Sequence, residues 1–94
     1  MKERLSLEAG RVAVSRAGRD RGTSYVLLTD PAEGRVLVAD GRGRTADHPK
    51  RKNVKHLMAK PRMLPGVSEK FSEKKRSLDQ EVRNILDADR FPEA

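Results

Sequence analysis

The first half of the chain shows the alternation of apolar and polar residues that is typical of short strands. Val12 and Val14 lie two positions apart and share one face, which predicts a half-buried strand over residues 11–15. Residues 23–29 are β-branched and aromatic and include four consecutive apolar side chains, so we expect a second strand that is covered on both faces. A third strand is predicted over residues 35–39.

Two further strands are predicted before residue 58. An Asp-Gly reversal precedes residues 42–45, which we expect to form an edge strand whose charges discourage pairing with other chains and which Pro49 ends. Residues 54–57 are predicted as one more short strand. About five strands and no helix signal within residues 5–57 indicate a mainly β fold, in the form of a small closed barrel.

The loop between the first two strands is the charged pentapeptide Gly18-Arg19-Asp20-Arg21-Gly22. Glycine reaches positive φ without a Cβ clash, so a glycine at each end lets the chain reverse while the charged side chains stay in water. Arg19 and Arg21 occupy alternate positions, which in an extended loop directs both guanidiniums away from Asp20 and towards phosphates. We expect Asp20 to cap N–H groups of the loop. The alternative is a solvated turn whose charges only keep the protein soluble.

The pattern changes after this β region. Prolines and a glycine interrupt residues 58–76, and Lys and Glu then alternate, so this stretch is predicted to be a basic, partly disordered linker. Ser77 followed three positions later by Gln80 is typical of a capping box, which predicts a helix over residues 77–88. Residues 89–94 would form a tail.

The predicted helix carries one apolar stripe. Its members recur at i, i+4, i+7 and i+8 and are Leu78, Val82, Ile85 and Leu86. A helix of roughly 12 residues is marginal in water unless such a stripe is packed against something. The surface that covers it could be the barrel, a second copy of the chain or another protein, so the stripe is a candidate protein contact.

Composition limits both the core and the chemistry. Of the 94 residues, 35% are hydrophobic and 37% are charged, so a continuous core is not expected to extend through the whole chain. Cysteine is absent, which excludes disulfides and cysteine-ligated zinc and is compatible with the reducing cytoplasm, where we expect the protein. We expect no secretory signal and no membrane span, because no apolar run approaches the required length.

Nothing in the sequence favours catalysis. The two histidines, His48 and His56, have no third ligand at metal spacing, and no nucleophile with a general base can be assembled from the sequence. We therefore expect a protein that is not an enzyme and that has no metal, no cofactor and no small-molecule substrate.

Charge gives the strongest functional indication. The net charge is +7, and residues 42–66 hold eight Lys and Arg side chains against one Asp. Such clustering attracts polyanions, either nucleic acid or an anionic membrane surface. The candidate nucleic-acid-binding residues combine this segment with the loop: Arg16, Arg19, Arg21, Arg42, Arg44, Lys50, Arg51, Lys52, Lys55, His56, Lys60 and Arg62. The alternative is a disordered basic arm without a fixed site.

Aromatic residues are too few to favour recognition by base stacking. Tyr25 lies inside an apolar run and is predicted to be a core residue rather than a stacking platform. Contacts to the phosphate backbone position a nucleic acid without reading its sequence. Recognition of the shape of a folded RNA is therefore favoured over recognition of its bases.

A resemblance to a known family covers about residues 6–57. Residues 10–41 resemble the KOW motif, and the Gly-Arg-Asp-Arg-Gly loop carries most of the likeness, together with Val12, Val14, Gly18, Asp20, Gly22 and Val26 at their spacings. With the basic run over residues 50–57, the chain is similar to KOW-domain large-subunit ribosomal proteins and to small bacterial KOW-domain RNA-binding proteins.

The resemblance implies an SH3-like β-barrel whose loops and basic edge bind ribosomal RNA. KOW domains also occur in transcription elongation factors, where they bind protein as well as nucleic acid. A protein-interaction module of the transcription or translation machinery is therefore the alternative function, because a fold defines a partner less sharply than a site does.

Overall fold

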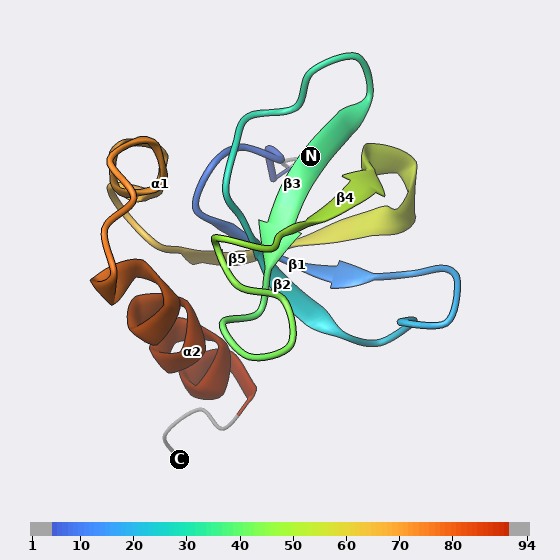
Figure 1. The fold of residues 1–94 in the computed structure, drawn as a ribbon. Helices are drawn as coiled ribbons and strands as arrows, with labels where there is room; N and C mark the ends of the chain where they lie inside the picture. Colours follow the sequence, from blue (N-terminus) through green and yellow to red (C-terminus); the bar gives the residue numbers. More distant parts are fainter. Residues whose placement is uncertain (1–4, 91–94) are drawn as a thin grey trace.

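The computed structural model describes residues 5–90 and consists of one antiparallel sheet followed by two helices (Figure 1). The elements are β1 (Arg11–Ser15), β2 (Ser24–Leu27), β3 (Arg35–Ala39), β4 (Lys50–Asn53), the 3-10 helix η1 (Val54–His56), β5 (Leu57–Met63), α1 (Val67–Ser72) and α2 (Ser77–Arg90). The five strands are ordered β4-β3-β2-β1-β5. The predicted mainly β fold with a C-terminal helix is confirmed. The two edge strands do not pair with each other, so the sheet is not closed and a barrel is not confirmed.

The first three strands follow the sequence pattern closely. β1 and β3 have the predicted bounds, and β2 is a shorter piece of the predicted second strand. The predicted reversal between β1 and β2 is confirmed, because the two strands pair antiparallel. Gly18 and Gly22, at the ends of the charged loop, have φ angles of +84° and +91°. These angles are in the region that side chains with a Cβ rarely adopt.

The edge strand predicted over residues 42–45 is wrong. The Asp40 carboxylate accepts hydrogen bonds from the backbone N–H groups of Arg42 and Arg44, both at 2.9 Å, and this folds the segment into a loop. The fourth strand is instead β4, which begins directly after Pro49. β4 pairs with β3, and Val36 lies opposite Lys52.

The last predicted strand, over residues 54–57, is also wrong for most of its length. Its first three residues form η1, because the Asn53 side chain accepts a hydrogen bond from the Lys55 N–H at 2.9 Å and turns the chain into a helical conformation. The predicted strand overlaps β5 only at Leu57.

The predicted linker over residues 58–76 contains regular structure. β5 extends to Met63 and pairs with β1, with Ala59 opposite Ala13, and α1 follows. Pro61 is tolerated because β5 is an edge strand and needs hydrogen-bond donors on one side only. The buried Arg11 guanidinium donates to the carbonyls of Lys60 and Pro61, at 3.3 and 3.2 Å, where the β1–β5 register shifts. Five of the eight basic residues of the segment 42–66 therefore lie in strands of the sheet rather than in a disordered arm.

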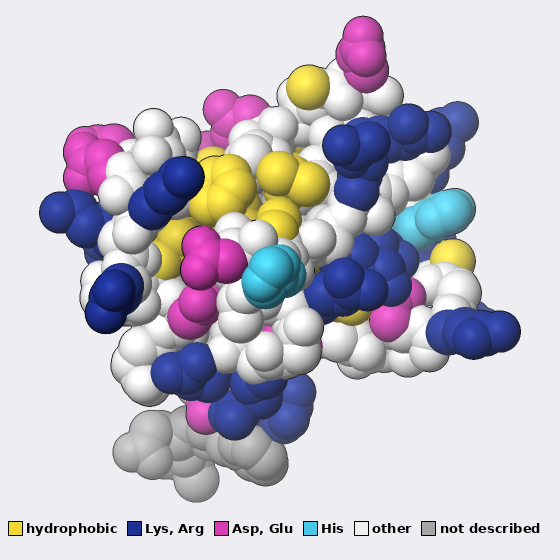
Figure 2. Space-filling model, in the orientation of Figure 1, with side chains coloured by type: hydrophobic (Ala, Val, Ile, Leu, Met, Phe, Trp, Pro, Cys, Tyr) yellow, Lys and Arg dark blue, Asp and Glu magenta, His cyan; other side chains and the backbone are white. Residues whose placement is uncertain are grey.

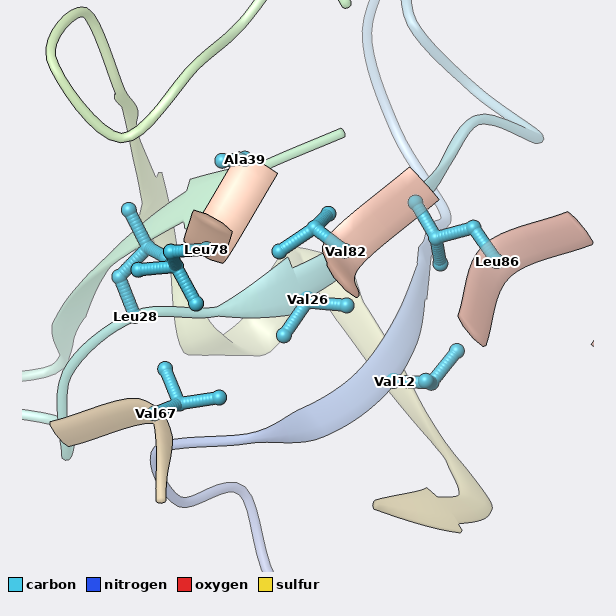
Figure 3. Close-up of a cluster of buried hydrophobic side chains, with 8 residues drawn as sticks. All are labelled: Val12, Val26, Leu28, Ala39, Val67, Leu78, Val82 and Leu86. Atoms are coloured by element: carbon cyan, nitrogen blue, oxygen red, sulfur yellow. The ribbon is translucent and has the colours of Figure 1, made fainter. Parts of the chain in front are cut away.

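Apolar side chains cover both faces of the sheet. One cluster comprises Ala13, Tyr25, Leu27, Val36, Val38 and Leu57. The other lies beneath the helices and comprises Val12, Val26, Leu28, Ala39, Val67, Leu78, Val82 and Leu86 (Figure 3). Adjacent residues of β2 enter different clusters, so the expectation that this strand is covered on both faces is confirmed.

The sheet itself covers the apolar stripe of α2. Leu78, Val82 and Leu86 are buried in the cluster beneath the helices, and Ile85 packs against that cluster while partly exposed. The stripe is therefore not available as a contact surface for another protein. The predicted capping box is not formed, because the Gln80 side chain bonds to Asn84 and Arg83 instead.

Helix α2 ends two residues later than predicted, at Arg90. The predicted tail, residues 89–94, thus begins inside α2 and otherwise lies outside the described residues. No helix within residues 5–90 has the length and apolar character that crossing a membrane requires.

Candidate nucleic-acid interface

The loop between β1 and β2 is held from beneath by Asp20. Its carboxylate accepts hydrogen bonds from the Ser15 hydroxyl at 2.9 Å and from the Tyr25 hydroxyl at 2.7 Å. The Asp20 side chain is only 13% exposed. The expectation that Asp20 caps N–H groups of its own loop is wrong, because within the described part of the chain its carboxylate bonds to side chains. Tyr25 is confirmed as a core residue, with 3% of its surface exposed.

Two lysines of β4 complete this cluster. The Nζ atoms of Lys50 and Lys52 each lie 3.1 Å from an Asp20 carboxylate oxygen, and Lys52 also donates to the Ser15 hydroxyl at 3.0 Å. They alternate along β4, which places both on the same face of the strand. The Asp20 cluster, defined by Ser15, Asp20, Tyr25, Lys50 and Lys52, therefore joins the β1–β2 loop to an edge of the sheet.

Asp20 and Tyr25 each keep one protonation state near neutral pH. Burial by itself would raise the pKa of Asp20, but hydrogen bonds from Tyr25, Lys50, Ser15 and Lys52 outweigh burial and hold that pKa well below its usual value. Burial and the adjacent Asp20 carboxylate raise the pKa of the Tyr25 hydroxyl well above its usual value. Asp20 thus remains charged while Tyr25 remains a hydrogen-bond donor.

Other basic side chains lie on the surface around the β1–β2 loop and η1. Arg19 and Arg21 are exposed on the loop. The Arg16 N–H donates to the His56 carbonyl at 2.8 Å, which places the base of the loop beside η1 and its exposed Lys55. Figure 2 shows Lys and Arg side chains gathered on the right of the view, where Figure 1 has the β1–β2 loop and the turn from β4 to β5.

We name this surface the basic end. It consists of the exposed side chains Arg16, Arg19, Arg21, Lys55 and His56, together with Arg35 and Arg51, which line a hollow that Asp30 and Glu33 also line. Within residues 5–90, none of these side chains forms an ion pair with Asp or Glu. The basic end therefore presents arginine and lysine side chains that are free to bind an external anion.

The basic segment over residues 42–66 does not form a single surface, contrary to expectation. Lys52 is buried, and Lys50 is half-buried in the Asp20 cluster. Lys60 and Arg62 lie 2.8 and 3.4 Å from the carboxylate of Asp89, which is only 9% exposed. Acidic residues that are distant in the sequence thus neutralise part of the segment.

Two more predicted residues of this segment lie in the loop after β3. Arg42 pairs with Asp87 of α2 at 3.5 Å, and both side chains are exposed. Arg44 is exposed in the same loop. Arg42 thus lies beside α2, away from the basic end, whereas the charge of Arg44 acts on the Tyr25 hydroxyl of the Asp20 cluster.

Arg35 is a member of the basic end that sequence reasoning missed. It begins β3, and its register partner on β4 is Asn53, the residue that caps η1. The two residues are far apart in the sequence, and only the strand register brings them together. The signal that could have found Arg35 is the pairing of β3 with β4, but the sequence pattern predicts the fourth strand over residues 42–45 instead.

No protein-family model matches the chain, and no curated protein matches its sequence. Within residues 5–90, no group of three or more His, Cys, Asp or Glu side chains is placed to hold a metal ion. The basic end is therefore interpreted from its own geometry and charge.

Proposed function

We propose that this chain is a non-enzymatic RNA-binding protein of the KOW type that docks on structured ribosomal RNA through the basic end. One observation carries the proposal: Arg19 and Arg21 are exposed on a loop whose own acidic residue, Asp20, is engaged beneath it by two lysines. Each guanidinium can fork two phosphate oxygens. The neighbouring Arg16 and Lys55 extend the same positive surface.

The Asp20 cluster prepares the loop for binding. Ser15, Tyr25 and two lysines of β4 bond to Asp20, so the loop is anchored before any ligand arrives. Binding by a pre-ordered loop loses less conformational entropy than binding by a disordered arm. This favours an RNA whose phosphates are themselves held in a defined geometry.

Base stacking at the basic end has no aromatic platform among the described residues except the imidazole of His56. Tyr25 is buried, and its hydroxyl is bonded to Asp20. Arginine and lysine contacts to phosphates fix orientation without reading sequence. We therefore assign the basic end to recognition of RNA shape.

The alternative function, a protein-interaction module of the transcription or translation machinery, has less support. The stripe that favoured it is packed on the sheet, with Leu78, Val82 and Leu86 buried. A protein partner would have to use another surface.

The proposal is tested by the salt dependence of binding to purified ribosomal RNA. In the double variant Arg19→Gln plus Arg21→Gln, the slope of log K against log salt should fall by roughly 0.7 to 0.9 for each phosphate that the variant no longer neutralises. The thermal unfolding midpoint should stay nearly unchanged, because both side chains are exposed. The matched control is Arg42→Gln plus Arg90→Gln, which removes the same charge from exposed arginines beside α2 and should leave the slope nearly unchanged.

Several outcomes would contradict the proposal. An equal loss of slope in both double variants would mean that net charge, and not the basic end, determines binding. A flat salt response combined with tight binding to a protein would favour the interaction module. Crosslinking in cells tests the ribosomal assignment, which fails if the attached RNA is mainly not ribosomal.

A further inference from the structure

A hollow of about 540 Å³ lies between α1, the turn that leads to α2, and residues 46–47. In Figure 1 this region and the β1–β2 loop are on opposite sides of the molecule. We name it the α1–α2 hollow and define it by the lining residues Lys70, Phe71, Lys74, Lys75, Arg76 and Asp79. Its volume falls within the range of about 300–1,000 Å³ that is usual for small-ligand sites.

Phe71 gives this hollow an aromatic wall. Its side chain is partly buried, packs against the cluster beneath the helices and also lines the hollow. The other aromatic residue within positions 5–90, Tyr25, is buried on the opposite face of the sheet. If a described phenyl or phenol ring stacks on a base, that ring is therefore Phe71.

Three consecutive cations, Lys74, Lys75 and Arg76, surround the aromatic wall. Lys74 follows the C-cap of α1 with a φ of +56°, and the Lys75 N–H donates to the Lys70 carbonyl at 2.9 Å, so backbone hydrogen bonding defines the turn. Lys74 and Arg76 are exposed and form no ion pair within the described residues. Lys75 has one distant partner, Glu73, at 3.7 Å.

The floor of the hollow is held by polar contacts of its own. Lys70 is paired with Glu81 at 2.5 Å, and this pairing lowers the pKa of Glu81. Asp79 accepts a hydrogen bond from the Ala46 N–H at 2.9 Å, which connects the hollow to the loop after β3. The exposed Asp47 carboxylate also lines the hollow, but the three cations of the turn outnumber it and leave the hollow positively charged.

We propose that the α1–α2 hollow binds one unpaired nucleotide of the RNA, with its base against Phe71 and the adjacent phosphates on Lys74, Lys75 and Arg76. This inference rests on the proposed function and adds a second binding site of a different kind. Stacking on an aromatic side chain tolerates any base, and lysine and arginine follow the backbone. The RNA would therefore present folded phosphates to the basic end and an unstacked base to the hollow.

An anionic membrane is the other partner that attracts cations beside an apolar side chain. Phe71 lines a hollow instead of protruding, and part of its surface is already packed on the core. A residue in this position is poorly placed to enter a lipid layer.

The test uses a uridine hexaribonucleotide in which one internal base is 2-aminopurine, whose fluorescence is quenched by stacking. We expect the wild-type chain to quench this probe. The variant Phe71→Leu keeps an apolar side chain on the core but removes the ring, so it should lose most of the quenching and bind about tenfold more weakly. A thermal unfolding curve checks that this variant is folded.

Two double variants separate the contributions. Lys74→Gln plus Lys75→Gln should weaken binding and lower its salt dependence but keep the quenching at saturation. Arg42→Gln plus Arg90→Gln, which removes the same charge outside both sites, should keep both the quenching and the affinity for this short probe.

The outcomes distinguish the two proposals. Unchanged quenching and affinity in Phe71→Leu would overturn the hollow as a nucleotide site while leaving binding of ribosomal RNA by the basic end intact. No binding of the wild-type chain to ribosomal RNA or to the hexamer would overturn both. A third outcome would assign the hollow to a membrane. In this case the chain binds phosphatidylserine vesicles, Lys74→Gln plus Lys75→Gln abolishes this binding, and the RNA probe is not quenched.

Discussion

Asp20 is a structural residue, although its position between two arginines in the sequence suggests a solvated turn. It lies between two arginines in the sequence, yet its ion-pair partners are Lys50 and Lys52, about thirty positions away. Its carboxylate compensates buried positive charge and fixes the loop, which leaves Arg19 and Arg21 exposed. A residue that looks like part of a solvated turn is therefore a structural centre.

Asp20→Asn should destabilise the fold strongly. The substitution leaves Lys52, whose side chain is 8% exposed, without a charged partner, and breaking a buried ion pair in this way costs about 3–5 kcal/mol. Urea unfolding at pH 7 should show this loss in the free energy of unfolding. Asp47→Asn, at an exposed carboxylate, is the control and should change it by less than about 0.5 kcal/mol.

The effect of Asp20→Asn should also depend on pH. Because the pKa of Asp20 is lower in the folded state than the unfolded value of about 3.9, the carboxylate stabilises the fold above that pH and loses this contribution as the pH falls further. The difference in free energy of unfolding between wild type and Asp20→Asn should therefore shrink between about pH 5 and pH 2. A difference that stays constant over this range would show that the charge of Asp20 is unimportant.

At the scale of elements, the docking of α2 is the main feature that connects the two halves of the chain. The Arg83 guanidinium donates to the Gly41 carbonyl at 2.6 Å, and Lys60 and Arg62 of β5 bind Asp89. The helical spacing of apolar residues in the sequence predicted the helix and its apolar stripe. They could not identify the covering surface, since an apolar stripe is complementary to many partners.

Gly41→Ala should reveal how closely α2 approaches the loop after β3. A Cβ at Gly41 would lie 2.7 Å from the Asp79 carbonyl oxygen, whereas one at Gly34 would meet nothing within 4 Å. The two glycines have φ angles of +78° and +76°, so Gly34→Ala has the same backbone cost, about 1–2 kcal/mol, and serves as the matched control.

Gly41→Ala should cost about 1–3 kcal/mol more than this control, because helix and loop must move apart. Thermal or urea unfolding of both variants measures the difference. Equal destabilisation would mean that α2 can shift without loss of packing.

For the whole molecule, the distribution of charge follows from the fold and not from the order of residues. The excess of +7 is concentrated in the sequence over residues 42–66. Asp20, Asp87 and Asp89, all from outside that segment, pair with five of its eight basic residues. The exposed positive charge is therefore found on the β1–β2 loop, on η1 and on the α1–α2 turn.

Sheet and helices should unfold as one cooperative unit. The cluster beneath the helices combines Val12 and Val26 of the sheet with Leu78 and Val82 of α2, so separating them would expose both sides of one core. Urea transitions followed by circular dichroism at 222 nm and by the fluorescence of Tyr25, which lies in the opposite cluster, should coincide. Loss of the helical signal at lower urea would show that α2 detaches independently.

The sequence by itself determined the features that depend on neighbouring residues. These features are the alternation over residues 11–15 and 35–39, the glycines that end the charged loop, and the helical stripe of Leu78 and Val82. All of them are local, because strand and helix periods and positive φ act within a few positions. The tertiary structure alone decided which charges are exposed. Asp20 and Lys52, or Arg62 and Asp89, meet only through strand register and helix docking, because an ion pair depends on distance in space and has no period in the sequence.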